Sequence, residues 1–196
     1  MKLSFPFKPN FSAESLAITE ELSFHTTKLY NAANYDLTEN GFKSYVDMNT
    51  HHAGNWHKEY LHSHNYQQCL KVLEKNWKSY FRSLDDFKAH PTKYKGMPKP
   101  PKYKNTDSRK NEIIFTNLAV RVKEDTLMLS LSKAMQKKFQ VDSLKFALPQ
   151  KVHSLVDFKN LQQVRVTYDQ SSKQWYLIIV YNKECMMLSM QTSMAA

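Results

Sequence analysis

The sequence YQQCLKVLEKNWKSYFRSL, residues 66–84, has the repeat of a long amphipathic helix. Its apolar residues recur at steps of three and four, which is the helical period and not the period of a strand: Tyr66, Leu70, Leu73, Trp77, Tyr80, Phe81 and Leu84. Its cations repeat with the same steps beside them: Lys71, Lys75, Lys78 and Arg82. We therefore predict a helix over residues 63–87 with one apolar and one basic face. A basic face is commonly just solvated surface, so its meaning depends on the other charges.

The composition indicates a folded, basic protein. The 196 residues are 41% hydrophobic and 13% aromatic, enough for one domain or two small ones with a real core. The net charge of +10 argues for a polyanionic partner, either nucleic acid or an anionic membrane surface. No apolar run approaches the roughly 20 residues of a membrane span, and no signal peptide is apparent, so we expect a cytoplasmic protein with no membrane partner. The two cysteines, Cys69 and Cys185, fit a reducing compartment and exclude a cysteine-based zinc site.

Most of the net charge, +7 of the total +10, comes from one proline-rich segment, residues 87–110. It holds eight Lys or Arg against one acid, Asp107, and four of the seven prolines. Such a chain is extended and not helical. We predict nucleic-acid contacts from four of its residues, three lysines that can neutralise phosphates and one tyrosine that can stack on a base: Lys99, Lys102, Tyr103 and Lys104. The alternative is a solubilising linker. We favour nucleic-acid binding, because the adjacent helix is equally one-sided in charge.

The segments on either side predict an α+β fold. Residues 2–9 alternate as a strand, which Pro6 places at a sheet edge or bends, and Ser12 is expected to cap a helix that runs to about residue 35. Residues 44–60 are expected to be helical in part. After residue 111 the period becomes two, with hairpins over 120–131 and 164–181, while 133–160 remains ambiguous. The first strand makes most sense if it joins the later strands, so the helices become an insertion into a small antiparallel β-barrel or sheet.

Catalytic and metal-binding patterns are weak in this sequence. Five histidines lie between His51 and His64, but no spacing among them puts three ligands on one ordered face, and no carboxylate pattern completes a site. Three glycines leave no nucleophile elbow or phosphate-binding loop, and the eighteen acids are scattered. We therefore predict no catalytic residue, no metal and no cofactor.

Six segments in order resemble the N-terminal half of the TnpB (OrfB) family of insertion-sequence-encoded, RNA-guided DNA nucleases, which are related to miniature type V CRISPR effectors. The segments are FHTTKLYNAANY (24–35), YQQCLKVLEKNWKSYFRSL (66–84), MPKPPKYK (97–104), NEIIFTN (111–117), LMLSLSK (127–133) and QQVRVTYDQSSKQWYLIIVYN (162–182). The resemblance covers nearly all of residues 1–183. It implies a wedge β-barrel with an inserted helical recognition domain, and guide RNA and target DNA as partners.

The resemblance also implies particular contacts. The four cations of the helix over 63–87 and the basic segment over 87–110 would hold the guide RNA. Five residues would read the DNA beside the target: Tyr45, Ser63, Gln67, Thr116 and Asn117. Ser63 stands where the family often has a lysine, which puts one contact in question. Amide side chains can pair with a base edge, whereas the alternative is that Gln67 and Thr116 are ordinary polar residues at element ends.

The expected organisation follows from this resemblance. It consists of a wedge-like barrel over 1–10 and 111–183, an inserted recognition domain over 11–87, a basic connector over 88–110, and a divergent tail over 184–196. In the family a RuvC-like nuclease domain with a zinc ribbon follows the last strand, whereas this sequence continues as CMMLSMQTSMAA (185–196). We therefore expect a truncated recognition lobe that is not itself an enzyme. The alternatives are one chain of a split nuclease, with a separate nuclease subunit as partner, or a decayed inactive fragment.

Overall fold

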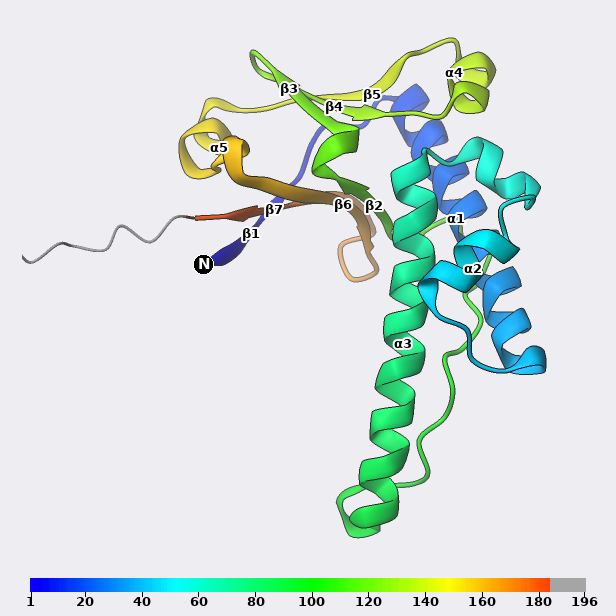
Figure 1. Cartoon of the computed structure of the whole chain (residues 1–196). Coiled ribbons are helices and arrows are strands. Elements are labelled where there is room, and N and C mark those ends of the chain that lie inside the picture. Colours follow the sequence, from blue (N-terminus) through cyan, green and yellow to red (C-terminus); the bar gives the residue numbers. More distant parts are fainter. Residues whose placement is uncertain (184–196) are drawn as a thin grey trace, which may run out of the picture.

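Two antiparallel sheets and a group of helices make up residues 1–183, the part of the chain that the computed structural model describes (Figure 1). The α+β class is therefore confirmed. The first sheet has four strands in the order β1-β7-β6-β2 and the second has three in the order β3-β4-β5, and neither closes into a barrel. The tail predicted over 184–196 lies outside the described residues.

The four-stranded sheet joins the start of the chain to its last described strand. β1 (Lys2–Phe7) pairs with β7 (Gln174–Asn182), which pairs in turn with β6 (Leu161–Asp169), and β2 (Ile113–Thr116) lies at the opposite edge. The first strand thus joins the later strands, as predicted. Pro6 lies on the edge strand β1, where a missing N–H is tolerated. Alternate side chains of the β6–β7 hairpin are fully buried and form its core face: Val164, Val166, Leu177 and Ile179.

The three-stranded sheet contains the other predicted hairpin. β3 (Val120–Lys123) and β4 (Thr126–Ser130) are joined by a tight turn in which Glu124 takes a positive φ of 50°. β5 (Ser143–Ala147) pairs on the far side of β4. The ambiguous segment contains this strand together with two short helices, α4 (Lys133–Phe139) and α5 (Gln150–Leu155), and the 3-10 turn η4 (Phe158–Asn160).

Two long helices form the inserted part. α1 (Ala13–Asn40) is capped at its start by Ser12, whose Oγ accepts the Ser15 N–H at 3.1 Å. It is followed by Gly41, whose φ of 83° suits glycine at a helix end. α1 is longer than predicted, since its polar buried residues do not show the simple apolar period. α3 (Ser63–Ala89) matches the prediction to within two residues at its end. The segment between them forms α2 (Tyr45–His51) and the 3-10 helix η1 (Trp56–Tyr60).

α3 packs on α1 through the predicted apolar face, since Leu70, Leu73 and Trp77 are buried. The indole Nε1–H of Trp77 donates to Asn34 of α1 at 2.8 Å. Figure 1 shows that the C-terminal half of α3 extends beyond α1 and α2, and that the chain then turns and runs back beside it through residues 90–112. The turn contains the 3-10 helix η2 (Pro91–Lys93), and another, η3 (Asn117–Ala119), follows β2. No helix within residues 1–183 combines the length and apolarity needed to cross a bilayer.

Candidate nucleic-acid interface

The exposed side of α3 carries a line of cations, which we name the α3 basic face: Lys71, Lys75, Lys78 and Arg82. All four are exposed, on the side of the helix away from the buried apolar residues. Lys78 pairs with Glu74 at 3.0 Å, and the Lys71 ammonium lies 4.8 Å from the centre of the Tyr45 ring. Such surface contacts contribute little to stability, so these cations can exchange them for phosphate groups.

The basic segment after α3 is extended but is not a loose linker. Asn34 of α1 donates to the Pro101 carbonyl at 2.9 Å. Asn31, one turn earlier on α1, donates to the Lys104 carbonyl and accepts the Lys104 N–H, both at 2.8 Å. These bonds fix the register of the segment against α1. They leave Lys99, Lys102 and Tyr103 exposed, whereas the Lys104 ammonium lies over the Tyr30 ring at 4.3 Å.

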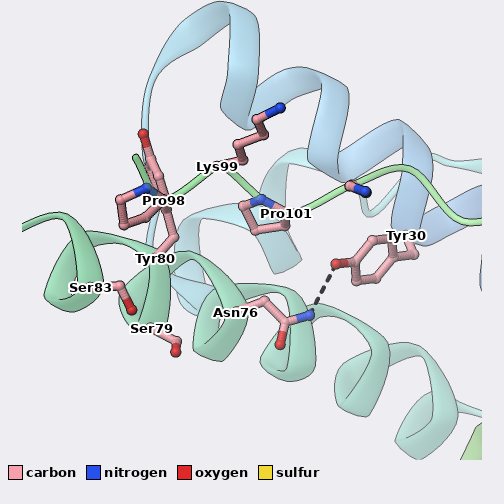
Figure 2. Close-up of a pocket in the computed structure, with 9 residues that line it drawn as sticks. Tyr30, Asn76, Ser79, Tyr80, Ser83, Pro98, Lys99 and Pro101 are labelled. Atoms are coloured by element: carbon pink, nitrogen blue, oxygen red, sulfur yellow. Dashed lines mark hydrogen bonds between the residues drawn. The ribbon is translucent and has the colours of Figure 1, made fainter. Parts of the chain in front are cut away.

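A shallow groove of about 330 Å³ separates this segment from α3. Figure 2 shows Pro98, Lys99 and Pro101 on one side and α3 on the other. The α3 side contributes Asn76, Ser79, Tyr80 and Ser83, and Asn76 donates to the Tyr30 hydroxyl at 3.0 Å. The groove therefore offers hydroxyl and amide groups beside lysines, a combination suited to a sugar–phosphate backbone.

The residues assigned to DNA reading lie on four elements, and Tyr45 is the first residue of α2. Ser63 and Gln67 occupy the first turns of α3, and Ser63 is exposed. Thr116 ends β2 and Asn117 begins η3. The two regions are held near each other, because Asn65 of α3 donates to the Ile114 carbonyl of β2 at 2.7 Å.

The side chains assigned to DNA reading differ in how accessible they are to a ligand. Asn117 is exposed, and its Oδ1 accepts the Leu118 N–H at 3.0 Å. The Thr116 hydroxyl oxygen is buried and has no hydrogen-bond partner within residues 1–183. Tyr45 is partly buried under Lys71, and its backbone N–H donates to Glu74 at 3.0 Å. Asn117 is thus better placed than Thr116 or Tyr45 to contact a base.

A second open pocket surrounds Trp56, a residue that no sequence pattern singles out. Its volume is about 670 Å³, and its wall includes Lys28, Asn31, Asn55 and His57. The Trp56 side chain remains 55% exposed although its ring packs on His57 at 4.3 Å. An exposed indole beside a lysine provides a stacking surface and a cation for a nucleotide. The only sequence signal is a tryptophan in a weakly patterned segment.

Behind Trp56 a buried histidine links α1 to η1. His25 lies with its Nε2 3.2 Å from Glu21 Oε1 and its Nδ1 2.9 Å from His57 Nδ1, and it stacks on Tyr60 at 4.1 Å. Burial lowers the pKa of His25 to about 4, although the Glu21 carboxylate acts in the opposite direction. The contacts are satisfied when neutral His25 donates to Glu21 and accepts from His57.

Glu21 links the buried His25 to the basic segment, because it contacts His25 and also pairs with cations from two other elements. It pairs with Arg109 at 2.9 Å and with Lys138 of α4. Burial alone raises the pKa of Glu21, but hydrogen bonds from Lys138 and Arg109 outweigh it, and the net shift is downward. Arg109 and Lys138 therefore share one largely buried carboxylate, which links α1 to the basic segment and to α4.

Neither a scan of the chain against protein-family models nor a search of curated proteins gives a match.

Proposed function

We propose that this chain binds nucleic acid as the recognition part of a TnpB-like, RNA-guided system, with a guide RNA and the DNA beside its target as ligands. The observation that carries the proposal is the exposed α3 basic face on a projecting helix, beside a second basic segment fixed by Asn31 and Asn34. Positive charge on two adjacent, ordered elements is the electrostatic pattern of a phosphate-binding surface.

The spacing of the α3 basic face suits one nucleic-acid strand. From Lys71 to Arg82 the helix rises about 17 Å at 1.5 Å per residue. At 3.4 Å of axis per nucleotide along one strand, this length matches about five nucleotides. Lys99 and Lys102 lie across the groove from α3 and supply further cations. The surface therefore grips backbone, and sequence would be read elsewhere, by base pairing and by the DNA-reading residues.

The finer architecture is part of the same proposal. The two sheets would correspond to the wedge-like barrel of the family, over 1–10 and 111–183, and α1 to α3 would correspond to the recognition domain inserted over 11–87. Residues 88–110 would be the connector. The pairing of β1 with β7, with the helices between them in sequence, supports this division.

Gln67→Ala and Asn117→Ala are each expected to weaken binding to the preferred flanking DNA by about 1–3 kcal/mol, because each removes an amide that can pair with a base edge. The chain is loaded with the RNA that copurifies with it, and binding is measured on duplexes with a randomised flanking motif. Gln150→Ala, in the first turn of α5, is the matched control. Equal losses on every flanking sequence would show that the two amides do not read bases.

Trp56→Ala is expected to weaken binding of a single-stranded oligoribonucleotide by about 1–3 kcal/mol, because one stacked base loses its aromatic partner. Trp56→Phe should retain most of the affinity. Tyr35 is an exposed aromatic residue on a different element, α1, and Tyr35→Ala serves as the control. Fluorescence anisotropy measures all four proteins. The assignment of Trp56 fails if the Phe variant loses as much as the Ala variant, or if Tyr35→Ala has the same effect.

A further inference from the structure

Three side chains that can ligate a metal converge where α1 meets the end of α2. Asp36 comes from α1, His51 is the last residue of α2, and His52 is its C-cap. The Nε2 atom of His51 lies 3.7 Å from one Asp36 carboxylate oxygen, and the Nε2 atom of His52 lies 3.7 Å from the other. One ligand atom of each residue lies within 4.8 Å of the others. The spacing of the histidines predicts no set of three ligands here, and this prediction missed Asp36, which comes from the preceding helix.

The burial of this cluster leaves one nitrogen unsatisfied. His52 is 8% exposed, and its Nε2 has no hydrogen-bond partner within residues 1–183. A buried polar atom without a partner is unfavourable, and ligation of an ion would satisfy it. The His51 side chain is exposed and gives an ion a route from solvent.

We propose that Asp36, His51 and His52 bind a divalent transition-metal ion of the zinc class. Two imidazoles and one carboxylate form a donor set typical of zinc, with a water in the fourth position. Ligand bonds of about 2.0–2.2 Å around a tetrahedral ion require the ligand atoms to lie about 3.3–3.6 Å apart. The observed separations need only small side-chain movements to reach this geometry.

The Asp36 carboxylate is paired with a lysine in this structure. The Lys43 ammonium lies 2.7 Å from both oxygens of Asp36, and Asn40 donates to one of them at 2.8 Å. Lys43 belongs to the loop between α1 and α2, so its side chain can turn to solvent when an ion arrives. Asn40 can remain and orient the carboxylate, as outer partners of metal ligands commonly do. The ion and Lys43 therefore compete for Asp36.

Because Lys43 and the ion compete for Asp36, metal titrations of variants can distinguish a specific site from ordinary surface histidines. The full chain is titrated with Co²⁺, followed by visible absorbance, and with Zn²⁺, followed by calorimetry. Wild type is expected to bind one ion, and the double variant His51→Ala/His52→Ala to lose that binding. Lys43→Met should bind more tightly, by roughly tenfold, because the carboxylate is free. The matched control is His62→Ala/His64→Ala, which removes a stacked histidine pair outside the cluster and should keep the wild-type affinity.

Thermal unfolding with and without Zn²⁺ provides an independent readout. An ion that joins α1 to α2 should raise the unfolding temperature of wild type, and that of Lys43→Met more strongly, because only the folded chain brings the ligands together. The His51/His52 variant should show no zinc-dependent rise. The proposal is overturned if wild type shows no saturable binding, if His62/His64 carry the binding instead, or if zinc stabilises the His51/His52 variant as much as wild type.

Discussion

RNA binding is expected to lose much of its salt dependence when the four cations of the α3 basic face are all replaced by glutamine: Lys71, Lys75, Lys78 and Arg82. Each lysine or arginine that neutralises a phosphate releases a counterion, and each such contact contributes about 0.7–0.9 to the slope of log affinity against log salt. Four lost contacts should therefore reduce the slope by roughly three. Filter binding of a structured RNA over a series of salt concentrations measures this slope.

The matched control changes the net charge equally on another surface. Four exposed lysines on the sheet side of the molecule are replaced by glutamine: Lys123, Lys151, Lys159 and Lys173. A general electrostatic attraction would make the two variants equivalent, whereas a local phosphate-binding surface makes only the α3 variant lose slope. If the α3 variant keeps the wild-type slope, its basic face is simply a solvated helix surface.

The second large effect concerns acid stability. The folded-state pKa of His25 is about 4, below the ordinary value of 6.5, chiefly because the ring is buried. Between these two values the unfolded chain binds a proton that the folded chain does not. This contribution to the free energy of unfolding is therefore complete above about pH 6.5 and is lost as the pH falls towards 4. A shift of this size corresponds to about 3 kcal/mol.

Urea unfolding of wild type and His25→Gln from pH 8 to pH 4.5 measures this contribution. Both proteins lose stability in acid, because the pKa values of His52, His57 and His62 are also lowered by burial. The variant is expected to show the flatter profile. Comparison at pH 8, where His25 is neutral in both states, isolates the pH-independent cost of removing its contacts. Parallel profiles for the two proteins would contradict the assigned shift.

Much of the fold could be predicted because its signals are local. The period of α3, the alternation along the β6–β7 hairpin and the cap at Ser12 each depend on residues close in sequence. Residues 133–160 could not be assigned, because α4, β5 and α5 are short and are stabilised by packing more than by their own pattern.

The candidate site divides in the same way. The basic face of α3 could be predicted, since a helical period places Lys71 and Lys75 on one side. The pocket around Trp56 could not, because the exposure of an indole depends on how η1 packs against α1. The contact between Asp36 and His52 likewise depends on the path of the loop between α1 and α2, and the periodicity of the sequence does not predict that path. DNA reading by Gln67 and Asn117 stays a prediction.

The pairing of β1 with β7 also has a consequence for the order of folding. Lys2 is the partner of Asn182, so β1, the first described strand, cannot pair until β7, the last described strand, has been synthesised. The contacts between α1 and α3 are closer in sequence and can form earlier, while β1 still exposes unpaired backbone groups. A nascent strand in this state is open to pairing with other chains, and Pro6, which removes one N–H from it, reduces that hazard.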